Sequence, residues 1–350
     1  MNTVIVTDPA YVPEVRSGIA TRLALGAIND PRDLPFVRLM ALLTVLMWPS
    51  AIYLSWPGNF RWWLAVPHIA MYVYFLGPFI LMLHNTSHRK LFTRRFSWMN
   101  QYVPWALGPL FGESPDTYYT HHVGMHHSEN NLKADLSSTM GYQRDSVVGF
   151  LHYFLRFFFI GLCELAMYFA RRGRYALLRR TIVGELVFLA AAAALLAVSW
   201  RAALVVLVVP FVVTRFGMMA GNWAQHAFID PASPENNYRN SITCINCTYN
   251  RRCFNDGYHI GHHLKQTRHW TDMPAEFEGN RAAYVREGAI VFEGVDFFVI
   301  WIFLMLRRYD RLAAHFVDLG DVKRSPAEIE ALLRGRTRRI EPTPLLASVR

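Results

Sequence analysis

Residues 255–263 read NDGYHIGHH and place histidines at positions 259, 262 and 263. On a helix these positions are i, i+3 and i+4, so the three imidazoles project from one face. Neutral imidazoles are common metal ligands. Three of them do not fill a coordination sphere, so this pattern predicts that other parts of the chain supply further ligands.

Two similar clusters and one outlying histidine provide such ligands. HxxxH and HxxxHH spacings occur earlier in the chain, and an Asn-Trp-Ala-Gln-His run begins at residue 222. The candidate ligands are His84, His88, His122, His126, His127, His226, His259, His262 and His263. One ion takes about four to six ligands, so these nine of the 14 histidines indicate two metal ions. All-histidine ligation suits iron, zinc or copper better than magnesium or calcium.

The apolar segments of the chain indicate a membrane protein. Of the 350 residues 53% are hydrophobic, and the net charge is +10, with basic residues clustered beside apolar segments. Membrane-length spans are expected at 36–56, 62–83, 181–199 and 202–219. Residues 146–170, which include Arg156 and Glu164, are expected at the interface. This placement of charge favours an anionic lipid surface, and no nucleic-acid partner is expected.

The predicted fold is an all-α membrane protein. Four transmembrane helices form two hairpins, which are capped by a cytoplasmic helical domain carrying the histidine clusters. Residues 1–35 are a cytoplasmic N-terminal segment, and residues 281–320 supply an apolar, interfacial helix packed on the domain. Residues 321–350 form a basic C-terminal tail. The positive-inside bias predicts a multi-pass protein with both termini and every histidine cluster on the cytoplasmic side.

HxxxH, HxxxHH and HxxHH in this order, interleaved with two hairpins, resemble the membrane fatty acid desaturase and hydroxylase superfamily over residues 36–280. The resemblance implies a non-haem diiron oxidoreductase that uses O2 and external electrons to desaturate a fatty acyl chain. It implies that His226 binds iron and that Asn222 holds a metal-bound water. No haem or ferredoxin signature is present. Electrons are therefore expected from a separate protein of the cytochrome b5, ferredoxin or rubredoxin type.

Several alternatives are compatible with the same residues. Hydroxylases, acetylenases and ketolases share the three clusters, and a histidine-rich metal transporter is an alternative of another class. His121 or His122 could be the ligand in the second cluster, and His122 is favoured. Cys244, Cys247 and Cys253 could form a small zinc site, but reduced, partly buried thiols are the simpler interpretation. Acidic residues near the clusters, including Asp135, could orient imidazoles or could simply be solvated.

Overall fold

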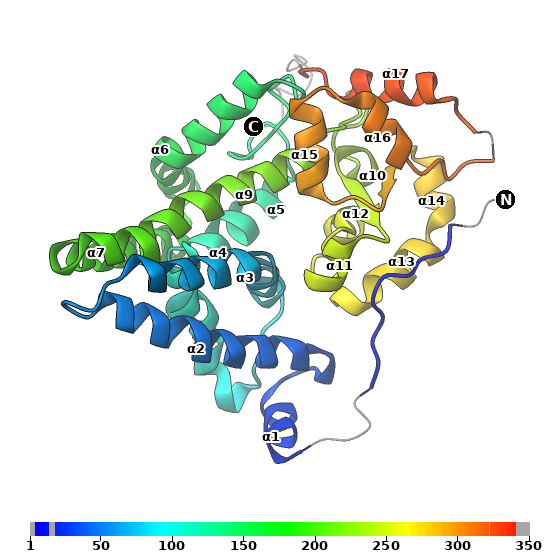
Figure 1. Cartoon of the computed structure of the whole chain (residues 1–350). Coiled ribbons are helices and arrows are strands. Elements are labelled where there is room, and N and C mark those ends of the chain that lie inside the picture. Colours follow the sequence, from blue (N-terminus) through cyan, green and yellow to red (C-terminus); the bar gives the residue numbers. More distant parts are fainter. Residues whose placement is uncertain (1–3, 14–17, 322, 341–350) are drawn as a thin grey trace. The chain divides into compact units, whose positions relative to one another are not determined.

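The computed structural model describes residues 4–13, 18–321 and 323–340 (Figure 1). The chain divides into two compact units. The first, called the histidine-rich unit here, comprises residues 1–10, 125–164 and 217–350. The second, called the hairpin unit, comprises residues 11–124 and 165–216. The divisions at 164 and 216 fall inside long helices, so each unit is assembled from segments far apart in the sequence.

The hairpin unit contains the two predicted pairs of long helices. Helices α2 (Leu34–Ser55) and α3 (Trp62–His88) pack against one another across a turn in which Gly58 has a φ of +81°. The second pair is α7 (Tyr175–Val198), followed by α8 (Trp200–Ala203), the π-helical η6 (Leu204–Val208) and α9 (Val209–Gln225). Continuous apolar sequence of this length favours buried or membrane-embedded helices. Both predicted hairpins are present.

Shorter helices complete the hairpin unit. The chain begins with α1 (Ile19–Ala27) and η1 (Pro31–Asp33). After α3 come η2 (Arg94–Gln101), η3 (Val103–Leu107), η4 (Gly108–Phe111), α4 (Thr117–His121) and η5 (His122–His126). Prolines at 104 and 109 stand in the first turns of η3 and η4, where a missing backbone N–H costs least. This explains why the apolar stretch at 97–112 is divided into short helices.

Among the residues that the structure describes, five helices, and not four, are long and apolar enough to cross a membrane by length and composition. Four correspond to the expected spans, and the fifth is α6 (Val147–Arg171), which was expected at the interface. The two charged side chains that made a membrane span at α6 unexpected form a pair, in which Arg156 donates to Glu164 Oε1 at 2.7 Å. Pairing lowers the cost of carrying both groups on one apolar helix. The predicted count of four is therefore not confirmed, although a multi-pass membrane protein is supported.

The fold is mostly helical, but the histidine-rich unit also contains a short parallel sheet. Strand β1 (Ile242–Ile245) pairs with β2 (Ile290–Glu293), with Ile242 opposite Ile290 and Ile245 opposite Glu293. The all-α expectation is therefore confirmed only as a mostly helical fold, and the single apolar helix expected within residues 281–320 is divided into strand β2 and shorter helices. Gly294, with a φ of +75°, ends the strand, and the Asp296 carboxylate caps α15 (Phe297–Met305).

The remaining helices of the histidine-rich unit are short. They are α5 (His127–Glu129), α10 (Asn237–Asn240), α11 (Thr248–Arg252), α12 (His259–Leu264), η7 (Trp270–Asp272), α13 (Met273–Gly279), α14 (Arg281–Arg286), α16 (Tyr309–His315) and α17 (Pro326–Arg336). Their core contains Cys244, Phe292 and Ile300, all fully buried. The predicted basic tail therefore includes a helix, α17, whose Leu333 is fully buried in this core. Residues 341–350 of that tail lie outside the described residues.

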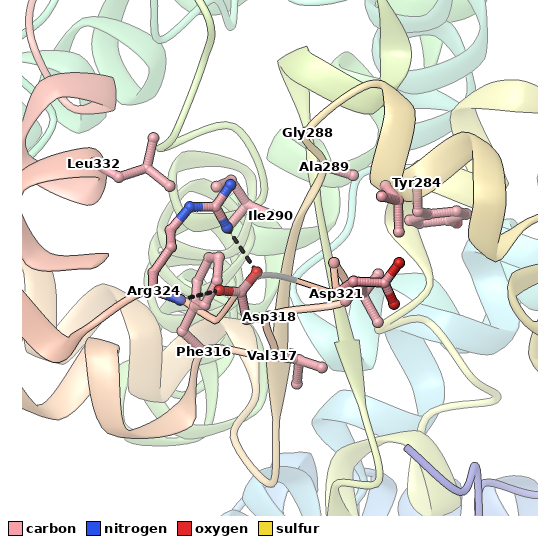
Figure 2. Close-up of a pocket in the computed structure, with 13 residues that line it drawn as sticks. Tyr284, Gly288, Ala289, Ile290, Phe316, Val317, Asp318, Asp321, Arg324 and Leu332 are labelled. Carbon is pink, nitrogen blue, oxygen red and sulfur yellow. Dashed lines mark hydrogen bonds and ion pairs between the residues drawn. The ribbon is translucent and has the colours of Figure 1, made fainter. Parts of the chain in front are cut away.

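A pocket of about 280 Å³ opens beside α14 and α17 (Figure 2). Its wall includes Tyr284, Ile290 and Leu332, and Arg324 forms an ion pair with Asp318 at 2.8 Å. None of the candidate metal ligands lines this pocket. The histidine clusters lie elsewhere.

Candidate metal centre

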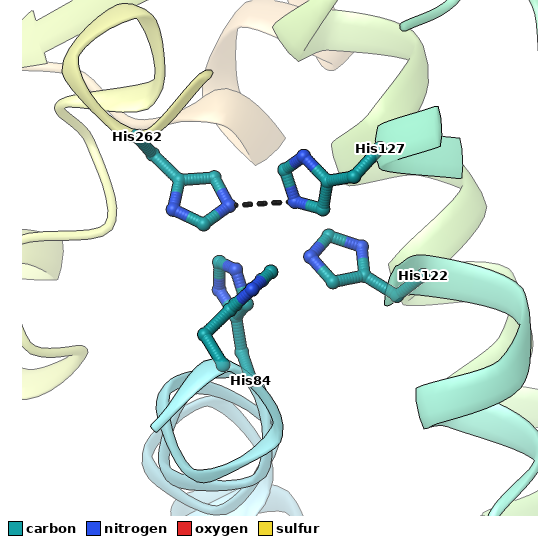
Figure 3. Close-up of side chains that lie close together, drawn as sticks. His84, His122, His127 and His262 are labelled. Atoms are coloured by element: carbon teal, nitrogen blue, oxygen red, sulfur yellow. Dashed lines mark hydrogen bonds between the residues drawn. The ribbon is translucent and has the colours of Figure 1, made fainter. Parts of the chain in front are cut away.

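The hairpin unit brings three candidate ligands together at the end of α3. His84 and His88 occupy its last turns at i and i+4, and His122 begins η5. Nitrogens of the three imidazoles lie within 4.8 Å of one another. The ring centroids of His84 and His122 are 4.6 Å apart, and both rings are drawn in Figure 3. His122, and not His121, is the member of the second cluster that joins this group.

The histidine-rich unit gathers the other six. Nitrogens of His126, His226 and His263 lie within 4.8 Å of one another, and all three side chains are buried. His259 adjoins this group, with its Nε2 3.0 Å from Nε2 of His263. His127 and His262 approach each other with an Nε2–Nε2 distance of 2.8 Å (Figure 3). The three residues of the NDGYHIGHH segment thus each contact a histidine, as their shared helical face predicts.

Hydrogen bonds to Nδ1 set the orientation of three of these imidazoles. His126 Nδ1 lies 2.6 Å from Asp135 Oδ2, and His226 Nδ1 lies 2.9 Å from the backbone oxygen of Asn240. His263 Nδ1 lies 2.9 Å from Asn130 Oδ1. Each partner is an oxygen that accepts, so each imidazole carries its hydrogen on Nδ1. This leaves the Nε2 lone pair of all three available to a metal.

Contacts between ring nitrogens fit a bound cation. The Nε2 of His259 lies 3.0 Å from that of His263 and 3.3 Å from that of His226. Since both neighbours present lone pairs, a single hydrogen on His259 can satisfy only one of these contacts. Metal–nitrogen bonds of about 2.0–2.1 Å separate two ligands of one ion by about 2.9–3.4 Å at right or tetrahedral angles. The observed spacing is that of imidazoles sharing an ion.

Burial keeps His226 and His259 in the neutral form that binds metals. It lowers the pKa of His226 to about 3 and the pKa of His259 well below the ordinary range for histidine. Burial alone would raise the pKa of Asp135, but the electrostatic attraction to His126 and the hydrogen bonds from His126 and Ser137 outweigh it and hold that pKa at about 2. A permanently charged carboxylate therefore faces His126. It favours the Nδ1–H form and strengthens Nε2 as a donor to a cation.

Two glycines allow the third cluster to form. A Cβ at Gly257 would lie 2.4 Å from the backbone oxygen of Cys244, and one at Gly261 would lie 2.7 Å from Glu276 Oε2. These close approaches let α12 lie against β1 and α13, in agreement with the contacts between these elements. The tight packing fixes where His259, His262 and His263 emerge.

The side-chain amide of Asn222 is held in place by two hydrogen bonds. Its Nδ2 donates to the backbone oxygen of Ser137 at 3.0 Å and to the hydroxyl of Tyr153 at 2.7 Å. Both amide hydrogens are used, and the hydroxyl of Tyr153 in turn donates to Ser137. The Oδ1 of Asn222 is therefore left as an acceptor four residues before His226. An acceptor there matches the role implied for Asn222.

Sequence reasoning undervalued the groups that orient the imidazoles. Asp135 was one of several acids treated as solvated by default, yet it is buried and contacts His126. The sequence gives no signal that Asn130 and the backbone of Asn240 contact histidines. For Asp135 the one available signal is the presence of an acid eight or nine residues after the last two histidines of the second cluster. His269, six residues after the third cluster, caps η7 by accepting from Thr271 N–H.

The cysteines do not support a zinc site. Cys244, Cys247 and Cys253 are buried and free, and within the described ranges neither metal-compatible group contains a cysteine. Burial raises the pKa of Cys247 to about 12 and that of Cys244 well above its usual value. These thiols are neutral, so they pack as small apolar side chains.

Comparison with known proteins agrees with this geometry. The family model described as fatty acid desaturase matches residues 61–294, which is more than half of the chain and contains every candidate ligand. Neither the comparison with curated proteins nor that with solved structures gave a match. Together with the helices of membrane-spanning length, the match makes this chain an integral membrane protein of the fatty acid desaturase family.

Proposed function

We propose that this chain is a membrane-bound non-haem diiron oxidoreductase that desaturates a fatty acyl chain. The family implies a lipid oxidoreductase. Two observations on the buried imidazoles carry the finer proposal. Acceptors hold the Nδ1 atoms of His126, His226 and His263. The Nε2 atoms lie 2.8–3.3 Å apart in the pairs His226–His259, His259–His263 and His127–His262. Hydrolytic zinc chemistry is less suitable, because an acyl chain offers no hydrolysable bond along its methylenes.

In this proposal nine histidines hold two iron ions. They are His84, His88, His122, His126, His127, His226, His259, His262 and His263. Bound iron would supply the activation of O2 that removes hydrogen from an unactivated C–H bond. Asp135 keeps the hydrogen of His126 on Nδ1, which would leave its Nε2 lone pair to an ion, and Asn222 Oδ1 would be available as an acceptor for a water held there. Burial of the imidazoles excludes bulk water from the reacting centre.

The apolar helices and the charge of the chain support the proposed substrate and electron source. Acyl lipids reach a membrane enzyme through the bilayer, and the five long apolar helices are consistent with such access. Electrons come from a separate protein of the cytochrome b5, ferredoxin or rubredoxin type. The chain carries 36 Lys and Arg against 26 Asp and Glu, a balance that favours an acidic donor. We place the histidine clusters and both termini on the cytoplasmic side, where such donors occur.

Fatty acid profiling of cells expressing the chain tests this function. The wild type is expected to produce a new double bond, and His262→Ala is expected to abolish it. His152→Ala is the matched control because His152 is exposed on α6 and belongs to neither metal-compatible group. A hydroxylated or keto product would instead identify another oxidation of the same superfamily. An unchanged profile in the wild type with its electron donor present would contradict the proposal.

A further inference from the structure

An aspartate near the N-terminus lies against the segment that carries the third histidine cluster. Asp8 belongs to the histidine-rich unit, although it precedes the family match, which begins at residue 61. It lies in an extended stretch, and only 8% of its surface is exposed. A buried carboxylate requires several hydrogen-bond donors. Three are present.

All three donors converge on one oxygen of Asp8. Its Oδ2 accepts from the Tyr258 hydroxyl at 2.6 Å, from the backbone N–H of Asn246 at 2.7 Å and from Asn250 Nδ2 at 3.0 Å. Tyr258 and Asn250 are fully buried. Bonds to a carboxylate are about twice as strong as bonds between neutral groups. One side chain therefore ties together the end of β1, helix α11 and the residue before α12.

This network leads directly to a metal-ligand candidate. Tyr258 is the N-cap of α12, and His259 is the first residue of that helix. Asn250, held by Asp8, uses its Oδ1 to accept the Gly257 N–H at 2.9 Å. Asn255 Nδ2 donates to the backbone oxygen of Pro9 at 2.8 Å, which adds a second contact from the same N-terminal stretch. Residues 255–258 are thus held on both sides before the helix begins.

We propose that Asp8 is a positioning residue for the metal centre, acting through Tyr258 on His259; this inference rests on the proposed metal-binding function. The Asp8 carboxylate fixes the start of α12. The position of this helix determines how closely His259 approaches His226 and how closely His262 approaches His127. A shift of a few tenths of an ångström at the N-cap changes metal–ligand distances, to which affinity is sensitive. Asp8 itself does not touch the metal or the substrate.

Iron release from the purified full-length protein to a ferrous chelator tests this role. Asp8→Ala is expected to accelerate release by about tenfold or more, within the range for groups that orient metal ligands. Asp8→Asn is expected to restore part of the retention, because its amide oxygen still accepts. Tyr258→Phe removes the same hydrogen bond from its other side and should also accelerate release. The double variant Asp8→Ala/Tyr258→Phe should be no worse than Asp8→Ala, because the contact with Tyr258 is already absent there.

Glu293→Gln is the matched control. The Glu293 carboxylate accepts from Asn246 Nδ2 at 2.6 Å, so it contacts the same loop from its exposed side without touching Tyr258. It should release iron at the wild-type rate. The Mössbauer spectrum of the retained iron should change in Asp8→Asn and Tyr258→Phe but not in Glu293→Gln. This readout distinguishes positioning from a general loss of stability, including in preparations where Asp8→Ala does not fold.

Three results would overturn the inference. They are wild-type release rates in both Asp8→Asn and Tyr258→Phe, strictly additive effects in the double variant, or an equal acceleration in Glu293→Gln. A wild-type protein that binds no iron would overturn the proposed metal function together with this role. Iron binding that is normal in the wild type and unaffected by the variants would overturn the role of Asp8 alone.

Discussion

Replacing Asp135 with asparagine should weaken metal binding by changing the tautomer of His126. Both carboxylate oxygens accept two hydrogen bonds. Oδ2 accepts from His126 Nδ1 at 2.6 Å and Asn131 N–H at 2.9 Å, and Oδ1 accepts from the N–H and hydroxyl of Ser137 at 2.7 and 2.6 Å. An amide has one oxygen, so its NH2 group must face donors on one side. If the NH2 group of the asparagine faces His126, it donates to Nδ1 of that imidazole, and Nδ1 can no longer carry a hydrogen.

The magnitude follows from that switch. A neutral imidazole that accepts at Nδ1 carries its hydrogen on Nε2, which removes the lone pair that would bind the metal. Removing a group that orients a metal-binding histidine costs about 10–100-fold in affinity, or about 1.4–2.7 kcal/mol. The other orientation, with NH2 facing Ser137, leaves His126 intact but opposes two buried donors and reduces stability instead.

Competition between the purified protein and a calibrated iron chelator measures this loss. Asp135→Asn should lower iron affinity by one to two orders of magnitude, as estimated from the range above. Asp321→Asn is the matched control, because Asp321 is an exposed acid at the pocket beside α14. Wild-type iron affinity together with wild-type thermal stability in Asp135→Asn would refute the reasoning, because each orientation of the amide predicts a loss of one or the other.

Three further predictions concern stability. Gly257→Ala places a Cβ 2.4 Å from a backbone oxygen, so it should lower the free energy of thermal unfolding by about 1–3 kcal/mol. The control Gly279→Ala has open space around its Cβ and should change this free energy little. Arg144→Met should lower the free energy of unfolding by about 3 kcal/mol or more, because this buried guanidinium donates to backbone oxygens of Ala227, Arg336 and other residues. Release of α17 by a protease would report the loss. An unchanged melting temperature would contradict the prediction. Because burial depresses the pKa of His226 to about 3, this residue should contribute a loss of about 1.4 kcal/mol of unfolding free energy per pH unit in the metal-free protein as pH falls from 6.5 towards 3, and no loss above 6.5. A His226→Asn variant should show a pH slope that is smaller by this amount, and an unchanged slope would contradict the prediction.

The elements that sequence reasoning predicted well are those with long, local signals. Apolar runs of membrane-crossing length predicted both hairpins, with ends within a few residues of α2 and α3. Spacings of three and four residues predicted that His259, His262 and His263 share a face, and each does contact another histidine. Both signals depend on helical periodicity alone, which neighbouring residues determine.

What sequence reasoning missed depends on distant partners. The strands β1 and β2 have four residues each and lie 48 positions apart at their first residues, so no hairpin signal joins them. Arg156 argued against a span because its partner Glu164 could not be identified from spacing. Asp135 resembles a solvated acid until folding places it against His126. Each of these features arises from tertiary contacts, which override local preference.

Asn222 lies between these cases. Its spacing before His226 was meaningful only through the family resemblance, yet its hydrogen bonds to Ser137 and Tyr153 explain the residue type. An aspartate could not donate to these oxygens, and a leucine would leave the Tyr153 hydroxyl without this partner. The amide both anchors itself and presents an acceptor. That combination requires asparagine or glutamine at this position.

Metal counting on the purified wild-type protein tests the central claim most directly. Native mass spectrometry with elemental analysis is expected to show two iron ions per chain, reduced in His263→Ala and retained in the exposed-site control His152→Ala. His263 is chosen because its Nε2 lies in the buried group with His126 and His226. Stoichiometric zinc in place of iron, or iron content that is unchanged in His263→Ala, would contradict a histidine-held diiron centre.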